Sequence, residues 1–216
     1  MSPVLFCIYI DTLLSRLQSS NFGCYIGHVF SGAIGYADDI ALIAPTHRSA
    51  QCLLDICENF ATEYCVLFNS SKSNVLYFDN RHRRNYSPPD LVLHGSPIPY
   101  VEQAVHLGSF IGRDANKYNL KKAMQDINGK VNLLICNYSF CHVQTLCYLF
   151  KTFCTSYYGS PLWKLDLNSL EEFCICWRKA VRRLLGLNSR TRSKFLPHIL
   201  NSLEIRSELL LRFSSF

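Results

Sequence analysis

The sequence predicts an α+β fold: a helix, a β-hairpin, a second helix and short strands, followed by a mainly α-helical region. Residues 1–112 combine apolar repeats of helical spacing with short alternating runs that are typical of strands. After Gly112 the pattern changes to three amphipathic stripes. The 216 residues are 49% hydrophobic and 18% charged, which is typical of a globular chain. We therefore expect two domains, residues 1–112 and 113–216.

The first half should begin with a helix. Ser2 is a suitable N-cap and Pro3 suits the first helical position, and apolar residues follow at helical spacing until about Gly23. Strands are expected within residues 24–29 and 33–44. These elements are expected to belong to one α+β layer.

A second helix should follow Pro45, capped by Thr46 or Ser49. Its apolar face repeats every 3.6 residues: Leu53, Leu54, Cys57, Phe60, Ala61 and Tyr64. Val75–Phe78 is expected to be a strand. Asp79–Asp90 is a polar loop, and further sheet elements are expected at Leu91–Leu93 and Ala104–Ile111, with a turn at residues 94–97.

The second half should consist of three helices that pack as a bundle. The three apolar stripes are Leu120, Ala123, Ile127, Val131 and Leu134; Val143, Leu146, Cys147, Phe150, Cys154 and Tyr157; and Leu170, Phe173, Cys174, Trp177, Val181, Leu184 and Leu185. Gly186 should end the third helix.

Two adjacent carboxylates mark the centre of the first hairpin. Tyr36-Ala37-Asp38-Asp39 lies between the apolar runs Ser31–Gly35 and Ile40–Ala44. Strand residues alternate between faces, but at a tight turn both acids can crowd toward one side. Paired carboxylates are suited to hold Mg²⁺. The alternative is a solvated turn, since Asp is a common turn residue.

Four motifs occur in a characteristic order. They are Ser2-Pro3-Val4-Leu5-Phe6-Cys7-Ile8-Tyr9-Ile10-Asp11, Tyr36-Ala37-Asp38-Asp39, Asn69-Ser70-Ser71-Lys72-Ser73 and His106-Leu107-Gly108. This order resembles a reverse transcriptase, most of all those of non-LTR (LINE-type) retrotransposons. Tyr158-Gly159-Ser160-Pro161-Leu162-Trp163 and Trp177–Leu184 look more loosely like the region that follows the polymerase domain in such elements.

The resemblance implies a partial polymerase palm in residues 1–112 and a thumb-like region in residues 113–216. It implies an RNA-directed DNA polymerase that uses two Mg²⁺ ions, dNTPs, an RNA template and a DNA primer. Asp38 and Asp39 would be the catalytic metal ligands, and Lys72 would protonate the leaving pyrophosphate or hold the triphosphate.

The resemblance also implies contacts with the primer. Tyr36 would support the primer terminus, and His106, Leu107 and Gly108 would form the primer grip. A surface lysine explains Lys72 equally well, and core packing explains Tyr36 almost as well.

The resemblance is incomplete, because an earlier strand with another catalytic Asp, the fingers and an Arg-Gln-Gly motif do not occur in these residues. Asp11 belongs to the helix after Ser2-Pro3 and is not expected to replace that Asp. The fragment alone is therefore expected to be inactive or nearly so. The alternative function is a non-catalytic nucleic-acid-binding remnant, and an untranslated or unstable relic is a third possibility.

Basic residues favour a nucleic-acid partner. Residues 1–80 contain three Lys or Arg and seven Asp or Glu, whereas residues 81–216 contain 19 and nine. Seven cations without an intervening acid lie in one segment: Arg178, Lys179, Arg182, Arg183, Arg190, Arg192 and Lys194. The first four share a helix face opposite Trp177 and could follow phosphates. A solvated helix face is the alternative.

The chain is expected to lie inside the cell, in the nucleus or cytoplasm, and not to be secreted. No apolar run approaches the ~20 residues of a membrane span, and the N-terminus lacks a basic lead-in. The 11 cysteines are an odd number, and Cys57, Cys147, Cys154 and Cys174 fall on apolar helix faces, so we expect small buried side chains there rather than disulfides. Zinc at Cys136, Cys141 and His142 is less favoured, because no second ligand pair follows. The oligomeric state cannot be inferred.

Overall fold

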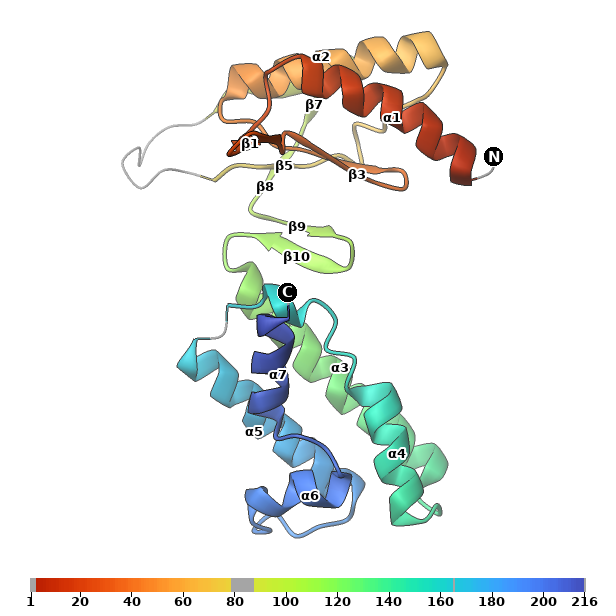
Figure 1. The fold of residues 1–216 in the computed structure, drawn as a ribbon, viewed down its shortest axis with the longest axis vertical. Coiled ribbons are helices and arrows are strands. Elements are labelled where there is room, and N and C mark those ends of the chain that lie inside the picture. Colours follow the sequence, from red (N-terminus) through yellow and green to blue (C-terminus); the bar gives the residue numbers. More distant parts are fainter. Residues whose placement is uncertain (1–2, 79–87, 165, 216) are drawn as a thin grey trace. The chain divides into compact units, whose positions relative to one another are not determined.

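The computed structural model describes residues 3–78, 88–164 and 166–215 and confirms the α+β fold (Figure 1). The chain divides into two compact units, Met1–Ala104 and Val105–Phe216. The sequence placed this division after Gly112. Residues 105–112 group with the second unit because strand β10 packs on helix α3. Most of the expected polar loop, residues 79–87, lies outside the described residues.

The two expected helices of the first unit are α1, Pro3–Ser19, and α2, His47–Tyr64. Thr46 caps α2, since its Oγ1 accepts a hydrogen bond from the Ser49 N–H at 3.1 Å. Arg16 joins the helices by donating to both carboxylate oxygens of Glu63 at 2.6 and 3.0 Å. The buried side chains between them form one core: Leu13, Leu17, Leu53, Cys57 and Phe60.

Strands β3, Ala33–Tyr36, and β4, Asp39–Leu42, form the expected antiparallel hairpin, which Figure 1 shows beneath α1. The strand expected within residues 24–29 is only two residues long, and a second strand follows it. Gly27 turns the chain with φ +61°, so that β1, Tyr25–Ile26, pairs back on β2, Val29–Phe30.

The remaining strands of the first unit are short. β5, Val75–Leu76, lies parallel to β8, Tyr100–Val101, and β6, Leu91–Leu93, pairs with β7, Ser96–Ile98. The Gln51 amide of α2 extends this hairpin, accepting from the Val92 N–H at 2.9 Å and donating to its carbonyl at 3.0 Å. The side chain thus satisfies backbone groups that a further strand would otherwise pair.

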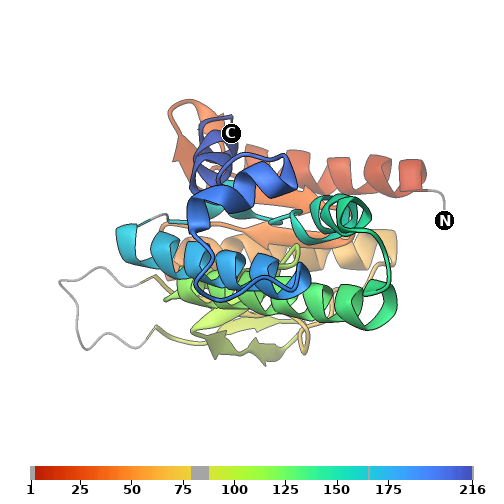
Figure 2. The ribbon, with the colours of Figure 1, turned by 90° about the horizontal axis from the view of Figure 1, so that it is seen from below.

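Strand β9, Gln103–His106, spans the division between the units, and β10, Ser109–Gly112, follows it in the second unit. The three expected helices are α3, Ala115–Tyr138; α4, Val143–Cys154; and α5, Leu167–Leu184. α3 and α5 lie side by side (Figures 1 and 2). In this unit the elements that were not predicted are the 3₁₀ turns η1, Ser160–Leu162, and η2, Ser193–Phe195, and the helices α6, Leu196–Leu200, and α7, Ile205–Ser214.

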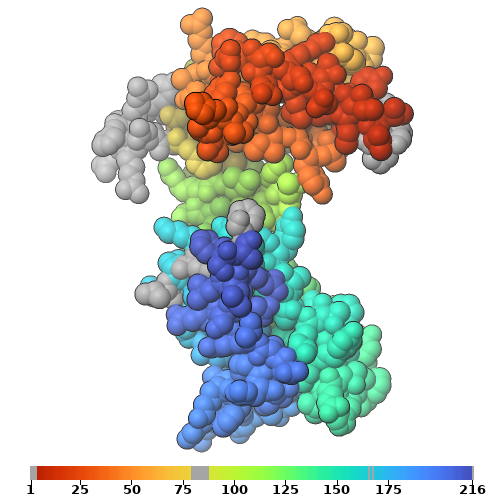
Figure 3. Space-filling model, in the orientation of Figure 1, coloured from red at the N-terminus to blue at the C-terminus, as the bar shows by residue number. Residues whose placement is uncertain are grey.

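Helices α6 and α7 pack against α4 and α5 and form one side of this unit, drawn in blue in Figure 3. They supply Leu196, Leu200, Ile205 and Leu209 to the core, each no more than 1% exposed. The core therefore extends beyond the three predicted stripes. None of the helices in the described residues is long and apolar enough to span a membrane.

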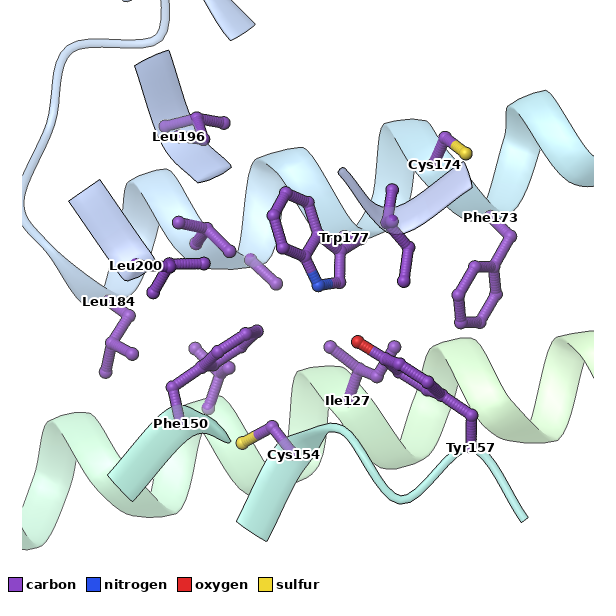
Figure 4. Close-up of a cluster of buried hydrophobic side chains, with 14 of the residues drawn as sticks. Ile127, Phe150, Cys154, Tyr157, Phe173, Cys174, Trp177, Leu184, Leu196 and Leu200 are labelled. Carbon is purple, nitrogen blue, oxygen red and sulfur yellow. The ribbon is translucent and has the colours of Figure 1, made fainter. Parts of the chain in front are cut away.

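Several aromatic side chains meet in the core of the second unit (Figure 4). Trp177 of α5 packs edge-on against Phe150 of α4, with ring centroids 6.1 Å apart, and Tyr157 packs edge-on against Phe173 at 5.6 Å. The Trp177 N–H and Tyr157 hydroxyl face each other without meeting hydrogen-bond geometry. Burial raises the pKa of Tyr157, so this hydroxyl stays neutral.

The cysteines are all free thiols. The prediction that Cys57, Cys147, Cys154 and Cys174 are buried is confirmed. Burial raises the pKa of the Cys57 thiol to about 12 and that of Cys154 to about 11. Because the thiolate is the reactive form, these two side chains act as small apolar residues.

Candidate functional site

The turn of the β3–β4 hairpin presents two carboxylates. Tyr36 pairs with Asp39, which leaves Ala37 and Asp38 as the two central turn residues. Ala37 has φ +50°, a left-handed conformation that costs a residue with a Cβ about 1–2 kcal/mol. Backbone strain of this kind is concentrated at functional sites. Asp38 and Asp39 are both exposed, so their oxygens are accessible to a cation.

Packing against the first helix holds the base of this hairpin. A Cβ on Gly35 would stand 3.5 Å from Leu14 Cδ1 of α1, which shows how closely the strand lies on the helix. Ala33, Ile40 and Leu42 pack against the core of the first unit. The base is thus fixed while the turn with its carboxylates projects into solvent.

Tyr36 lies at the end of β3 and is 63% exposed. The alternative that its ring packs in the core is therefore wrong. Its ring is next to the carboxylate turn and is available for a ligand, which agrees with the role that the resemblance implies.

The residues present fit a divalent cation in chemical type. Aspartate oxygens are the hard ligands that Mg²⁺ prefers, and both carboxylates are adjacent at one turn. Among the described residues no group of three or more His, Cys, Asp or Glu gathers into a metal site, and this also leaves the zinc alternative without support there. Asp38 and Asp39 are therefore the candidate ligands that these residues contribute.

Lys72 lies in a turn that Asn69 organises. The Asn69 Oδ1 accepts from the N–H groups of Ser71 at 3.0 Å and Lys72 at 3.2 Å. The Lys72 side chain is exposed. Its ammonium group is thus free to meet an anionic ligand, and the surface-lysine alternative stays open.

The His106-Leu107-Gly108 motif forms the turn between β9 and β10. Leu107 and Gly108 have φ +49° and +76°, as a two-residue type I′ turn requires. The Tyr158 hydroxyl donates to the Leu107 carbonyl at 2.8 Å, and the Lys122 ammonium donates to the Gly108 carbonyl at 3.0 Å. His106 is the last residue of β9 and is half-buried. The turn is thus held by side chains of its own unit.

The basic stripe of α5 is mostly engaged within the protein. Arg178 donates to the Cys174 carbonyl and pairs with Glu171. Arg182 donates to the Thr191 carbonyl from Nε at 3.1 Å and from Nη2 at 2.9 Å, and to Ser193 Oγ at 2.8 Å.

Arg183 donates to the backbone and side-chain oxygens of Asn128 at 3.3 and 3.2 Å. Lys179 is exposed, and so are three cations of the following loop and turn: Arg190, Arg192 and Lys194. The accessible positive charge thus lies mainly beyond the predicted stripe.

Arg182 should therefore stabilise the fold, whereas Lys179 should not. Arg182→Ala removes three charge-assisted hydrogen bonds that hold the loop, and we expect it to lower the free energy of unfolding by about 1–3 kcal/mol. Lys179→Ala, on the same helix, should change it by less than about 0.5 kcal/mol. Urea unfolding of both variants measures the difference. Equal stability of the two would contradict this role of Arg182.

Sequence reasoning missed the residues that hold the β9–β10 hairpin. Asn119 of α3 accepts from the Phe110 N–H at 2.8 Å and donates to its carbonyl at 3.0 Å. Lys122 lies less than one helical turn further along α3. A polar residue on a helix surface carries no local signal of such a contact. Tyr158 stood in a motif that was recognised, but without a role.

Comparison with known protein families shows the class to which this chain belongs. Residues 1–128 match the family "Reverse transcriptase (RNA-dependent DNA polymerase)". This is more than half of the chain, and the chain belongs to the reverse transcriptase family.

The chain is similar to the Retrovirus-related Pol polyprotein from type-2 retrotransposable element R2DM of Drosophila melanogaster. The two are 35% identical over 72 residues, which are 33% of this chain and 7% of the relative. This likeness supports the predicted place among reverse transcriptases of non-LTR retrotransposons. The chain aligns with only a small part of the relative's length.

Proposed function

We propose that these residues form the catalytic hairpin, the primer grip and the thumb of an RNA-directed DNA polymerase that uses a two-metal mechanism. The observation that carries the proposal is the two-residue turn with Asp38 at its centre and Asp39 directly after it, both exposed. Membership of the reverse transcriptase family supports it. The substrates would be dNTPs, an RNA template and a DNA primer.

Each residue of the hairpin has a definite part in this proposal. Asp38 and Asp39 would hold the Mg²⁺ ions, and the ions, when bound, would supply the charge that activates the attacking oxygen and stabilises the leaving one. The strained turn keeps both carboxylates in place before the cations bind, so less ordering is needed at the moment of reaction. The exposed ring of Tyr36 supports the end of the primer.

Lys72 acts on the triphosphate in this proposal. Its ammonium group either balances the negative charge or gives a proton to the leaving pyrophosphate, and general-acid help of this kind typically gives about 10²–10⁴-fold in rate. The exposed position in a turn held by Asn69 supports either role.

Residues 1–216 by themselves are proposed to be inactive or nearly so. Two carboxylates offset only half of the charge of two divalent cations. The β3–β4 hairpin is two-stranded in the described residues, and Ile34 on it is 51% exposed. A further strand that carries a carboxylate would supply the missing negative charge and would cover the exposed apolar side chain of the hairpin.

The chain by itself tests the proposal. We expect it to bind an RNA–DNA hybrid with a recessed primer, more weakly as salt rises, and to add no nucleotide with Mg²⁺ above the level of Asp38→Asn. Fluorescence anisotropy measures binding, and gel analysis of a labelled primer measures addition. Ready magnesium-dependent addition would refute the inactivity, and a lack of hybrid binding at low salt would refute the proposed function.

A nucleic-acid-binding role without catalysis is the second candidate. The exposed Arg190, Arg192 and Lys194 favour it, and they alternate with Thr191 and Ser193, which Arg182 holds in place. This role predicts that neither Asp38→Asn nor Mg²⁺ changes the affinity for the hybrid. It also predicts that a protein containing these residues adds no nucleotide to the primer.

A further inference from the structure

The segment Tyr157–Trp163, which follows α4, has two opposite faces. Tyr157 and Trp163 are 4% and 3% exposed, and both rings pack edge-on against Phe173, with centroids 5.6 and 5.4 Å away. Tyr158, directly after Tyr157, is 69% exposed. The segment is thus anchored in the core of the second unit while Tyr158 points outward from it.

The outward side chain meets the tip of the β9–β10 hairpin. The Tyr158 hydroxyl donates to the Leu107 carbonyl at 2.8 Å. A Cβ on Gly108 would stand 3.4 Å from Tyr158 Cε1, and one on Gly159 would stand 3.0 Å from Ser109 Oγ. Both glycines also have positive φ, +76° and +75°. Glycine at both positions therefore allows the two backbones to approach closely.

A second side chain holds the same tip from helix α3. Lys122 Nζ donates to the Gly108 carbonyl at 3.0 Å and lies 6.0 Å from the centroid of the Phe110 ring. Lys122 and Tyr158 thus occupy the carbonyl oxygens of both central turn residues. Asn119 fixes the strand behind the turn through Phe110.

These hydrogen bonds matter because packing under the tip is incomplete. A cavity of about 90 Å³ lies between Gly108 and Ser109, helix α3 and the segment after α4. Leu107 is also held at φ +49°, which is unfavourable for a residue with a Cβ. With a gap on one side and strain in the turn, the position of the tip depends on its polar contacts.

We infer that Tyr158 and Lys122 are positioning residues of the primer grip, and that Tyr157–Trp163 is the element that connects the grip to the core of the thumb. The inference rests on the proposed assignment of the β9–β10 turn as the primer grip. The two side chains fix the position and orientation of the β9–β10 turn, and they do not contact the reacting atoms themselves. The motif Tyr158–Trp163 thereby acquires a role that the resemblance did not supply.

The first test measures opening of the hairpin in the 216-residue chain by amide hydrogen exchange. Tyr158→Phe removes only the donating hydroxyl, and we expect the amides of residues 103–112 to exchange about tenfold faster, with those of α5 unchanged. Lys122→Met should have a similar effect, and Lys122→Arg should restore slow exchange because it keeps a donor. The controls Tyr148→Phe and Lys121→Met change exposed residues of α4 and α3 and should have no effect.

The second test measures recognition of the primer end. The chain should bind an RNA–DNA hybrid with a recessed DNA 3′ end more tightly than a blunt hybrid of equal length, and the ratio of the two dissociation constants is the readout. Tyr158→Phe and Lys122→Met should reduce that ratio about three- to tenfold, and Lys122→Arg should return it to the wild-type value. General destabilisation would weaken both complexes alike and leave the ratio unchanged.

The outcomes separate this inference from the function on which it rests. Unchanged hairpin exchange in Tyr158→Phe overturns the inference, whatever the hybrid does. If Tyr158→Phe speeds amide exchange in the hairpin but leaves the preference for the recessed-end hybrid unchanged, the positioning role is overturned. A wild-type chain that binds hybrids without preferring a recessed end overturns the primer-grip assignment, and the role of Tyr158 toward the primer with it.

Discussion

Replacing Asp38 by Asn should lower nucleotide incorporation about a thousandfold or more in an active reverse transcriptase that contains these residues. The substitution keeps the shape of the side chain and removes the charge that holds a divalent cation. A thousandfold loss corresponds to about 4 kcal/mol of transition-state stabilisation, within the several kcal/mol that a metal ion supplies. Single-nucleotide addition to a labelled primer, measured at saturating Mg²⁺ and dNTP, gives the rate.

The same assay separates catalysis from folding. Asp38 is exposed, so Asp38→Asn should change the free energy of unfolding by no more than about 0.5 kcal/mol. Asp11→Asn is the matched control, because Asp11 is an exposed carboxylate on helix α1 that is not expected to bind metal. Loss of activity in Asp11→Asn would assign to Asp11 the part of the further carboxylate. Full activity in Asp38→Asn would exclude the two-metal proposal for this hairpin.

Local patterns account for what the sequence predicted well. The apolar repeat of α2 predicted its buried residues Leu53, Cys57, Phe60 and Ala61, and Thr46 caps the helix as expected. Both signals depend on neighbours a few residues apart, so the sequence displays them directly. The carboxylate hairpin was predictable for the same reason, since its strands and its turn are adjacent in the chain.

Long-range side-chain contacts explain what the sequence could not predict. Arg182 looked like a solvent-facing or phosphate-binding cation on a helix, but its guanidinium group holds Thr191 and Ser193, nine and eleven residues away. Lys122 meets Gly108 across 14 residues and Tyr158 meets Leu107 across 51. Residue type and helical spacing predict which side chains share one face of a helix. They do not predict which loop packs on that face.

Helix α6 was missed for a different reason. Leu196–Leu200 is only five residues long and contains Pro197, so no helical period can be recognised in it. Its leucines are nevertheless fully buried against α4 and α5. Tertiary packing, rather than local propensity, stabilises this segment.

Trp177→Ala should cause the largest loss of stability in the second unit. Trp177 is 2% exposed and packs between Phe150 of α4 and the Tyr157 side chain (Figure 4), so its removal leaves a cavity bordered by α4 and α5. Deleting a buried Trp typically costs about 3–5 kcal/mol. That is a large part of the ~5–15 kcal/mol by which a domain is stable. We therefore expect a much lower midpoint of urea unfolding, and in the extreme a second unit that is unfolded at 37 °C.

The design of the measurement follows from the composition, because the chain contains two tryptophans. In Trp177→Ala the remaining Trp163 is buried in the same unit, so its fluorescence reports unfolding of that unit. Ile175→Ala is the matched control, since Ile175 is 42% exposed on the same helix and should cost less than about 1 kcal/mol. Trp177→Phe keeps a buried aromatic ring at this position and should be milder than Ala. If Ala and Phe were equally harmful, or if Ala cost no more than the Ile175 control, the core assigned to α4 and α5 would be incorrect.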